Sequence, residues 1–183
     1  MIGDALACVV DDLNLHLAGA RETGGQAPVK LGGLGKGNHS PPDDVVVLAL
    51  TALEEEKNIH FSAQALRGES ALARKTDPVF LNLHVVFAAT HRRYHYALNA
   101  LASVVRHLQA KPCYDERTTA KFPAGLGQLS FTMEKLHYAD LNQIWGYLGS
   151  DSFPSAYYTV RALGLGAGQI NAVVPTVNQV ENS

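Results

Sequence analysis

Two histidines, His91 and His95, stand four residues apart in a stretch with helical periodicity. That spacing can place two imidazoles on one face of a helix, where they could share a metal ion. A zincin pattern also needs a glutamate directly after the first histidine, and Arg92 occupies that position. Arg92 and Arg93 would repel a divalent cation, and no third ligand is obvious in the sequence. We therefore expect a polar helix flank and no bound metal.

A glycine-rich stretch over residues 19–42 raises the alternative of a phosphate-binding loop. Such a loop needs the pattern G-x-x-x-x-G-K followed by serine or threonine, between a strand and a helix. Here Gly35 and Lys36 are followed by Gly37, and Lys30 occupies the position of the first glycine. A proline pair then opposes a following helix. We interpret the stretch as a long flexible loop without a nucleotide.

The other reactive side chains are dispersed along the chain. Cys8 and Cys113 are too few and too widely spaced for a disulfide scaffold, so we expect two reduced thiols. His84 alternates with apolar neighbours, which is typical of a core or edge position in a strand. The run from Glu54 to Glu56 could hold a cation, although acids at a strand end are more often solvated. No G-x-S-x-G elbow is present. The sequence thus predicts a protein that is not an enzyme and has no cofactor.

Composition limits the classes of partner. The chain has 183 residues, of which 46% are hydrophobic and 17% charged, as expected for one globular domain. The net charge is -2 and no long basic run occurs, so we expect no nucleic-acid binding. No apolar run approaches the ~20 residues that span a bilayer, and no basic segment opens a secretory signal. We expect synthesis in the cytoplasm, no membrane insertion, and surfaces suited to protein partners.

Hydrophobic periodicity predicts the elements that must carry these residues. Helices are expected over 2–18, 91–109 and 138–148, and strands over 45–53, 79–87, 128–135 and 157–163. The order α-β-β-α-β-α-β predicts an α/β (α+β) fold, a single domain with a mixed sheet flanked by helices. We expect this domain over residues 1–163, with flexible loops at 19–42 and 57–77 and an extended arm at 164–183.

Two predicted helices also identify candidate core residues. Thr90 is a plausible N-cap of the second helix, and Gly149 a plausible C-cap of the third. The expected core positions on these helices are Leu98, Leu101, Val105, Leu141, Ile144, Trp145 and Leu148.

The C-terminal arm retains regularly placed apolar residues after the helical periodicity ends. Valine-rich extended segments are suited to strand addition at a partner's sheet edge. A frayed terminus is the alternative. The interface residues that we expect there are Ile170, Val173, Val174, Val177 and Val180.

Several stretches taken together resemble one known family. They are the apolar stripe of residues 1–17, the strand at 78–87, the helix at 94–108, the helix at 141–149, and the segment 154–161. The most specific are a Leu-Asn-Leu strand before a Tyr-x-x-Ala-Leu helix, and Ile-Trp-x-x-Leu-Gly followed by Pro-Ser-x-x-Tyr. In order and spacing these motifs resemble the tail-terminator, or cap, family of extracellular contractile injection systems, from residue 1 to about residue 163.

The resemblance implies a fold like that of phage tail terminators and a purely structural role. It also implies a ring, expected to be a hexamer, that would sit on the last layer of inner tube and sheath, stop polymerisation and hold the sheath extended. Its partners would be other copies of itself and the sheath and inner-tube proteins of a particle that can be released from the cell. The long loop at 19–42 departs from the pattern, and the lack of a large domain after the tail implies a minimal cap.

Two alternatives remain open at this point. One is another structural component of the same machine, in the baseplate or associated with the tube. The other is a small metal- or nucleotide-dependent enzyme that uses His91 and His95 or the glycine-rich loop.

Overall fold

The computed structural model of the protein describes residues 2–19, 28–35, 41–56, 67–68, 71–75, 79–149, 152–165 and 170–175. The helices are α1 (Ile2–Gly19), α2 (Tyr94–Ala110) and α3 (Tyr138–Leu148). The strands are β1 (Val29–Leu31), β2 (Val46–Glu55), β3 (Arg67–Gly68), β4 (Ala71–Lys75), β5 (Val79–Ala89), β6 (Cys113–Asp115), β7 (Gln128–Met133), β8 (Ser155–Leu165) and β9 (Ile170–Pro175).

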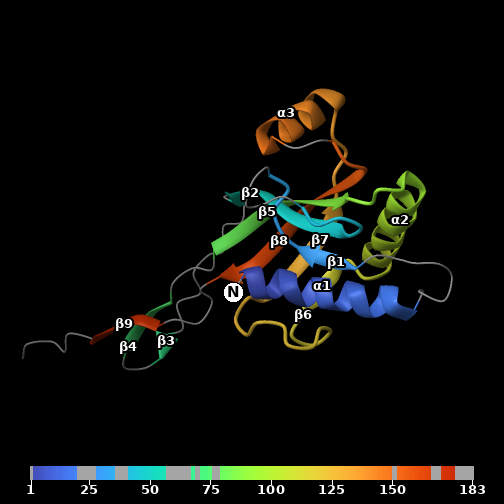
Figure 1. The fold of residues 1–183 in the computed structure, drawn as a ribbon. Coiled ribbons are helices and arrows are strands. Elements are labelled where there is room, and N and C mark those ends of the chain that lie inside the picture. The colour runs from blue at the N-terminus through green and yellow to red at the C-terminus, as the bar shows by residue number, and fades with distance from the viewer. Residues whose placement is uncertain are drawn as a thin grey trace, which may run out of the picture.

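A six-stranded mixed sheet forms the body of the molecule. Its strand order is β1-β2-β5-β8-β7-β6, with β1 parallel to β2 and every other neighbouring pair antiparallel. Figure 1 shows α1 and α2 on one side of this sheet and α3 on the other. The predicted fold class, a mixed sheet flanked by helices, is confirmed. The major elements α1, β2, β5, α2, β7, α3 and β8 follow the expected order α-β-β-α-β-α-β.

The first hydrophobic core lies between the sheet and the helices α1 and α2. Helix α1 contributes Leu6, Val9, Leu13 and Leu17, spaced three or four residues apart, and all four side chains are buried. Burying one such side chain stabilises a fold by about 1.5–3 kcal/mol. The amphipathic helix expected over residues 2–18 is therefore held on the sheet by this stripe.

The start of α2 differs from the prediction. The helix begins at Tyr94, and its N-cap is Arg93 rather than Thr90. Strand β5 runs on to Ala89, so the chain must turn before the helix can start. The buried Thr90 hydroxyl instead donates to the Pro42 carbonyl and accepts the Val45 N–H at 3.4 Å, which fixes the entry to β2.

The buried face of α2 is also rotated from the expected one. Leu98, a predicted core residue, is 44% exposed, whereas Ala97 and Ala100 face the sheet with Val104. Two alanines allow the helix axis to approach the sheet closely, and this turns the larger Leu98 toward solvent. Leu101 and Val105 are partly buried and pack against the flank of the first core.

Five short strands were not predicted. β1 lies inside the expected loop at 19–42, β3 and β4 inside the expected loop at 57–77, β6 follows α2, and β9 lies in the expected arm. Each consists of six residues or fewer and is defined by pairing with a neighbour rather than by its own periodicity.

Asn14 of α1 holds β1 in place. Its side-chain amide exchanges two hydrogen bonds with the Val29 backbone, at 2.7 and 2.9 Å.

Strands β3, β4 and β9 form a second, three-stranded antiparallel sheet. Figure 1 shows it set apart from the main sheet, beyond the ends of β5 and β8. The expected domain boundary at residue 163 falls inside β8, which runs to Leu165. Of the expected interface residues, Ile170, Val173 and Val174 lie in β9. Val177 and Val180 lie outside the described residues.

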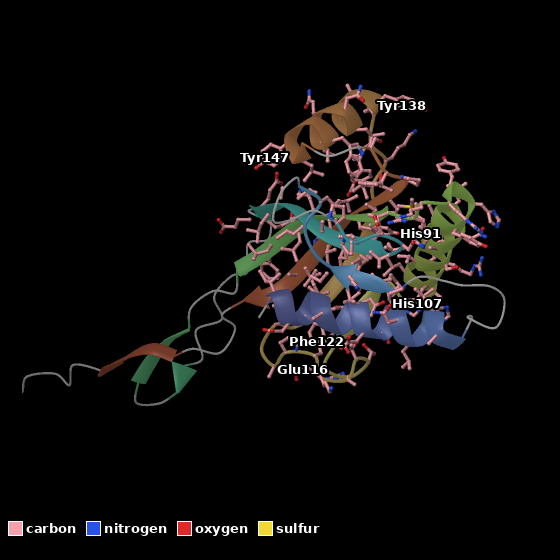
Figure 2. All side chains as sticks on the ribbon, in the orientation of Figure 1. His91, His107, Glu116, Phe122, Tyr138 and Tyr147 are labelled. Carbon is pink, nitrogen blue, oxygen red and sulfur yellow. The ribbon has the colours of Figure 1, made fainter. Side chains whose placement is uncertain are left out.

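A polar cluster centred on Asp12 joins α1 to the end of α2. The Asp12 carboxylate lies 2.9 Å from His107 Nε2 and accepts a hydrogen bond from Lys111 Nζ at 3.0 Å. Figure 2 shows His107 where α2 meets α1. Burial alone would raise the pKa of Asp12, but the hydrogen bonds from Lys111 and His107 outweigh it, and the pKa is lowered. The cluster therefore stabilises the folded state whenever Asp12 is ionised.

We expect Asp12→Asn to lower the free energy of unfolding by about 1–3 kcal/mol at neutral pH, because a charge-assisted interaction is lost. Since the folded-state pKa of Asp12 is depressed, its contribution is present above the unfolded pKa and is lost as pH falls through the folded pKa. Urea unfolding of both proteins at pH 7 and near pH 3 measures this. A stability difference that does not shrink in acid would contradict it.

Candidate assembly surface

Helix α3 is fixed on the second face of the sheet by a single large anchor. Trp145 is 8% exposed and packs against Phe153 with the ring centres 6.0 Å apart. Leu141, Ile144 and Leu148 are partly buried against the same second core, which includes Val47 and Val86 of the sheet. Helix α3 thus presents its apolar stripe to the sheet.

The ends of α3 have local caps. At the start, the His137 N–H donates to the Asp140 carboxylate at 3.2 Å. At the end, Gly149 adopts a φ of 63°, and its N–H donates to the Trp145 carbonyl at 3.1 Å. This left-handed conformation is favourable for glycine and stops the helix, as the sequence predicts.

A groove of about 420 Å³ lies between α3 and the strands β2, β5 and β8. Its wall on the helix side includes Ile144 and Tyr147, and its floor on the sheet includes Ala52, His84 and Tyr157. Burial raises the pKa of the Tyr157 hydroxyl, so this group stays neutral and can donate a hydrogen bond. A groove with apolar walls and a few polar groups is suited to binding side chains of a partner.

Acidic side chains line the rim of this groove. Glu54 of β2 and Glu134, just after β7, both belong to its lining. Glu54 Oε2 lies 3.5 Å from His84 Nε2, while His84 Nδ1 lies 3.2 Å from the Thr159 hydroxyl. His84, expected at a core or edge position, thus links β2 to β8. The rim gives the groove a preference for a cationic or hydrogen-bond-donating partner group.

Glu56 is held differently from Glu54. Its Oε2 forms an ion pair with Arg161 Nη2 at 3.0 Å and accepts a hydrogen bond from the Asn82 side-chain amide at 3.3 Å. The acids at the end of β2 are therefore separated by their contacts, instead of converging on a cation. Among the residues that the structure describes, no group of three or more His, Cys, Asp or Glu side chains could hold a metal ion.

The two histidines four residues apart do not share a helix face. His91 precedes α2, and within the described residues neither of its ring nitrogens has a hydrogen-bond partner. Burial lowers the pKa of His91, which favours the neutral ring. His95 lies inside α2, where its Nε2 is 3.2 Å from the Asn99 amide nitrogen. The helical spacing considered for a metal pair was thus based on a wrong helix start.

Large apolar side chains lie exposed around α3. Tyr138 is 87% exposed and Tyr147 is 86% exposed, and Figure 2 shows them at opposite ends of the helix. Met133, which precedes this helix, is also exposed. Aromatic and methionine side chains are enriched where proteins contact each other. The sequence did not predict this surface, because Tyr138 and Tyr147 lie off the apolar stripe that defines the helix and Met133 lies at the end of β7.

The fold formed by this sheet and its helices is that of a tail terminator. The chain is similar to the sheath/tube terminator, in the extended state, of the extracellular contractile injection system PVC, with 15% identity and a TM-score of 0.54. The match covers 100% of this chain and 65% of that chain, so the present chain spans less than two thirds of the relative. A further match, to the tube-terminating cap of the anti-feeding prophage, has 16% identity, a TM-score of 0.49 and coverage of 76% and 49%.

A family model provides the more specific assignment. The Pvc16 N-terminal domain matches residues 6–179, and the chain belongs to this family. No curated protein matches the chain. The resemblance to contractile-injection-system terminators seen in the sequence is confirmed by the family match. The family model and the sheath/tube terminator that matches over the whole chain are those of structural proteins and not of enzymes, which agrees with the prediction from the sequence.

We expect Trp145→Ala to lower the free energy of unfolding by about 3–5 kcal/mol, because it leaves a cavity under α3. Tyr147→Ala is the matched control on the same helix, and its effect should stay within about 0.5 kcal/mol because the side chain is exposed. Chemical denaturation monitored by circular dichroism measures both. Equal effects of the two substitutions would show that Trp145 does not anchor the helix.

Proposed function

We propose that the protein is a structural cap of a contractile, phage-tail-like particle, ending the inner tube and sheath and holding the sheath extended. The observation that carries this proposal is membership of the Pvc16 N-terminal domain family over nearly the whole chain. The fold shared with a sheath/tube terminator adds support. In this role the protein would act by binding the end of the tube and sheath, so its function would depend on the properties of its protein interfaces.

We propose a homohexameric ring as the working form, in contact with sheath and inner-tube proteins. A ring arises from a heterologous contact, in which one surface of a subunit binds a different surface of the next. The groove beside α3 and the exposed tyrosines of that helix provide surfaces suited to such contacts. Nucleic acid and lipid have no part in this proposal.

The location follows from the same proposal. The cap is made in the cytoplasm and becomes part of a particle that is released from the cell. None of the helices in the described part of the chain has the length and apolar character needed to cross a membrane.

Deletion of the gene from a cell that makes the particles tests the proposal. We expect tubes of irregular length and a larger share of contracted sheaths in electron micrographs, because nothing stops polymerisation or fixes the last sheath layer. Restoring the gene should restore particles of uniform length with the protein at one end only. Normal particles in the deletion strain would refute a capping role.

Complementation with Tyr138→Ala/Tyr147→Ala locates the contact surface. Both residues are exposed, so the variant should fold with normal stability but occupy fewer particle ends. Leu15→Ala, which removes an exposed apolar residue from α1, is the matched control and should complement fully. Equal occupancy by all three proteins would exclude the α3 surface from the contact.

A further inference from the structure

Strand β2 extends beyond its neighbour β1. On one side, β1 pairs only with residues 46–48 of β2, while on the other side β5 pairs with β2 as far as Glu55. Within the described part of the chain, no strand pairs with residues 49–55 on the side of β1. Among the residues that the structure describes, these seven residues of β2 therefore form an open sheet edge next to the groove.

The backbone groups at this open edge can be assigned from the neighbouring hydrogen bonds. The Val46 N–H donates to the Pro28 carbonyl and the Leu48 carbonyl accepts the Gly32 N–H, both at 3.1 Å, so these residues point toward β1. A one-residue irregularity lies between Leu50 and Ala52. Past it, the Glu56 N–H donates to Phe80 of β5 at 2.9 Å. Because direction alternates along a strand, Leu50, Leu53 and Glu55 present their N–H and C=O groups to the open side.

The side chains beside this edge are also incompletely covered. Leu50 and Leu53 are 45% and 49% exposed, and Leu53 lies opposite Leu83, a residue of the first core. On the other face of the sheet, Ala52 and Glu54 line the groove below α3. An added strand would place alternate side chains over the two leucines and into the groove. The edge therefore offers both backbone and side-chain contacts to an extended segment.

Strand β9 has the properties of such a segment. It is the edge strand of the small sheet, paired with β4 on one side and with no described strand on the other. Its six residues match the seven open residues of β2 in length, and Ile170, Val173 and Val174 are β-branched. Pro175 stands at its end, so no proline interrupts the pairing.

Charge also favours this partner. The described strands of the small sheet contain Arg67, Arg74 and Lys75 and no acidic residue. The open end of β2 contains Glu54 and Glu55. Opposite charges on the two surfaces favour their encounter and disfavour pairing of two like edges.

The small sheet and the open edge lie at different places on one molecule. β4 leads into β5 and β8 leads into β9, and Figure 1 shows the small sheet projecting beyond the main sheet, past the ends of β5 and β8. A contact between these two surfaces on different copies is head to tail, and such a contact gives a ring when the rotation from copy to copy closes.

We propose that β9 of one copy pairs with residues 49–55 of β2 in the next copy, so that a continuous sheet crosses each subunit boundary. This inference rests on the ring in the proposed function, and it specifies the contact between neighbouring subunits of that ring. The acceptor is the open edge of β2 with Leu50, Leu53 and the acidic rim, and the donor is the free edge of the basic small sheet.

Leu53→Pro in the full chain tests the acceptor. Proline removes the N–H that faces the open side but leaves the β5 side of the ladder intact. We expect self-association, measured by light scattering after size exclusion, to weaken about tenfold or more, with unchanged circular dichroism. Leu53→Ala removes the side chain but keeps the N–H, so it should weaken association less. The proposal is overturned if the proline variant and the wild type associate equally. It is also overturned if the wild-type chain is monomeric both in solution and on tube ends.

Exchanging the charges between the β2 edge and the small sheet tests donor and acceptor together. Unlike the proline substitution, it leaves the backbone N–H groups in place. Glu54→Lys/Glu55→Lys and Arg74→Glu/Lys75→Glu should each weaken association, and the chain with all four substitutions should regain much of it. A four-fold variant that associates no better than either pair of substitutions overturns the assignment of β9 and its sheet as the donor.

The outcome for capping is read separately, as occupancy of purified tube ends. A chain that binds tube ends as a ring insensitive to Leu53→Pro refutes the strand pairing and leaves the proposed function standing. A chain that associates through this edge but never binds tube ends supports the pairing and refutes the capping role.

Discussion

The burial of β5 on both of its faces is the constraint on which the rest of the structure depends. Leu83, Val85 and Phe87 lie in the core shared with α1 and α2, and Val86 and Ala88 lie in the core below α3. A strand that is apolar on both faces must lie in the interior of a sheet and needs a helical layer on each side. The position of α3, and with it the groove, follows from this requirement. β2 and β8 lie on either side of β5, because they are the two strands that pair with it.

Strong periodicity made the large elements predictable, whereas features that depend on pairing were not. The stripe through Trp145 identified α3 because Leu141, Ile144 and Leu148 share one helical face with this tryptophan. The same reasoning failed for Leu98, since it favoured large side chains and overlooked Ala97 and Ala100 as the contact face of α2. β1 has only three residues, and its stability comes from β2 and from the Asn14 side chain, neither of which a local pattern contains.

The candidate surface was less predictable than the fold because it joins residues that are distant in sequence. Ala52, His84, Ile144 and Tyr157 meet only when β2, β5, α3 and β8 are assembled. The exposure of Tyr138 and Tyr147 likewise follows from how α3 is seated, which Trp145 determines. The sequence motifs identified the family but not the candidate surface. They reflect the order and spacing of helices and strands, and not the contacts between distant residues.

The irregularity between Leu50 and Ala52 bears on whether the open edge of β2 could form fibrils. A flat, regular edge accepts almost any extended chain and can seed fibrils, whereas a bulge twists the strand and restricts which partners fit. The pairing of β4 with β9 is interrupted in a comparable way between Arg74 and Lys75. If the β2 edge and β9 pair as proposed, their irregularities would restrict by shape which strands can pair and would oppose indefinite growth. For a protein proposed to end a polymer, a barrier against forming one is a useful property.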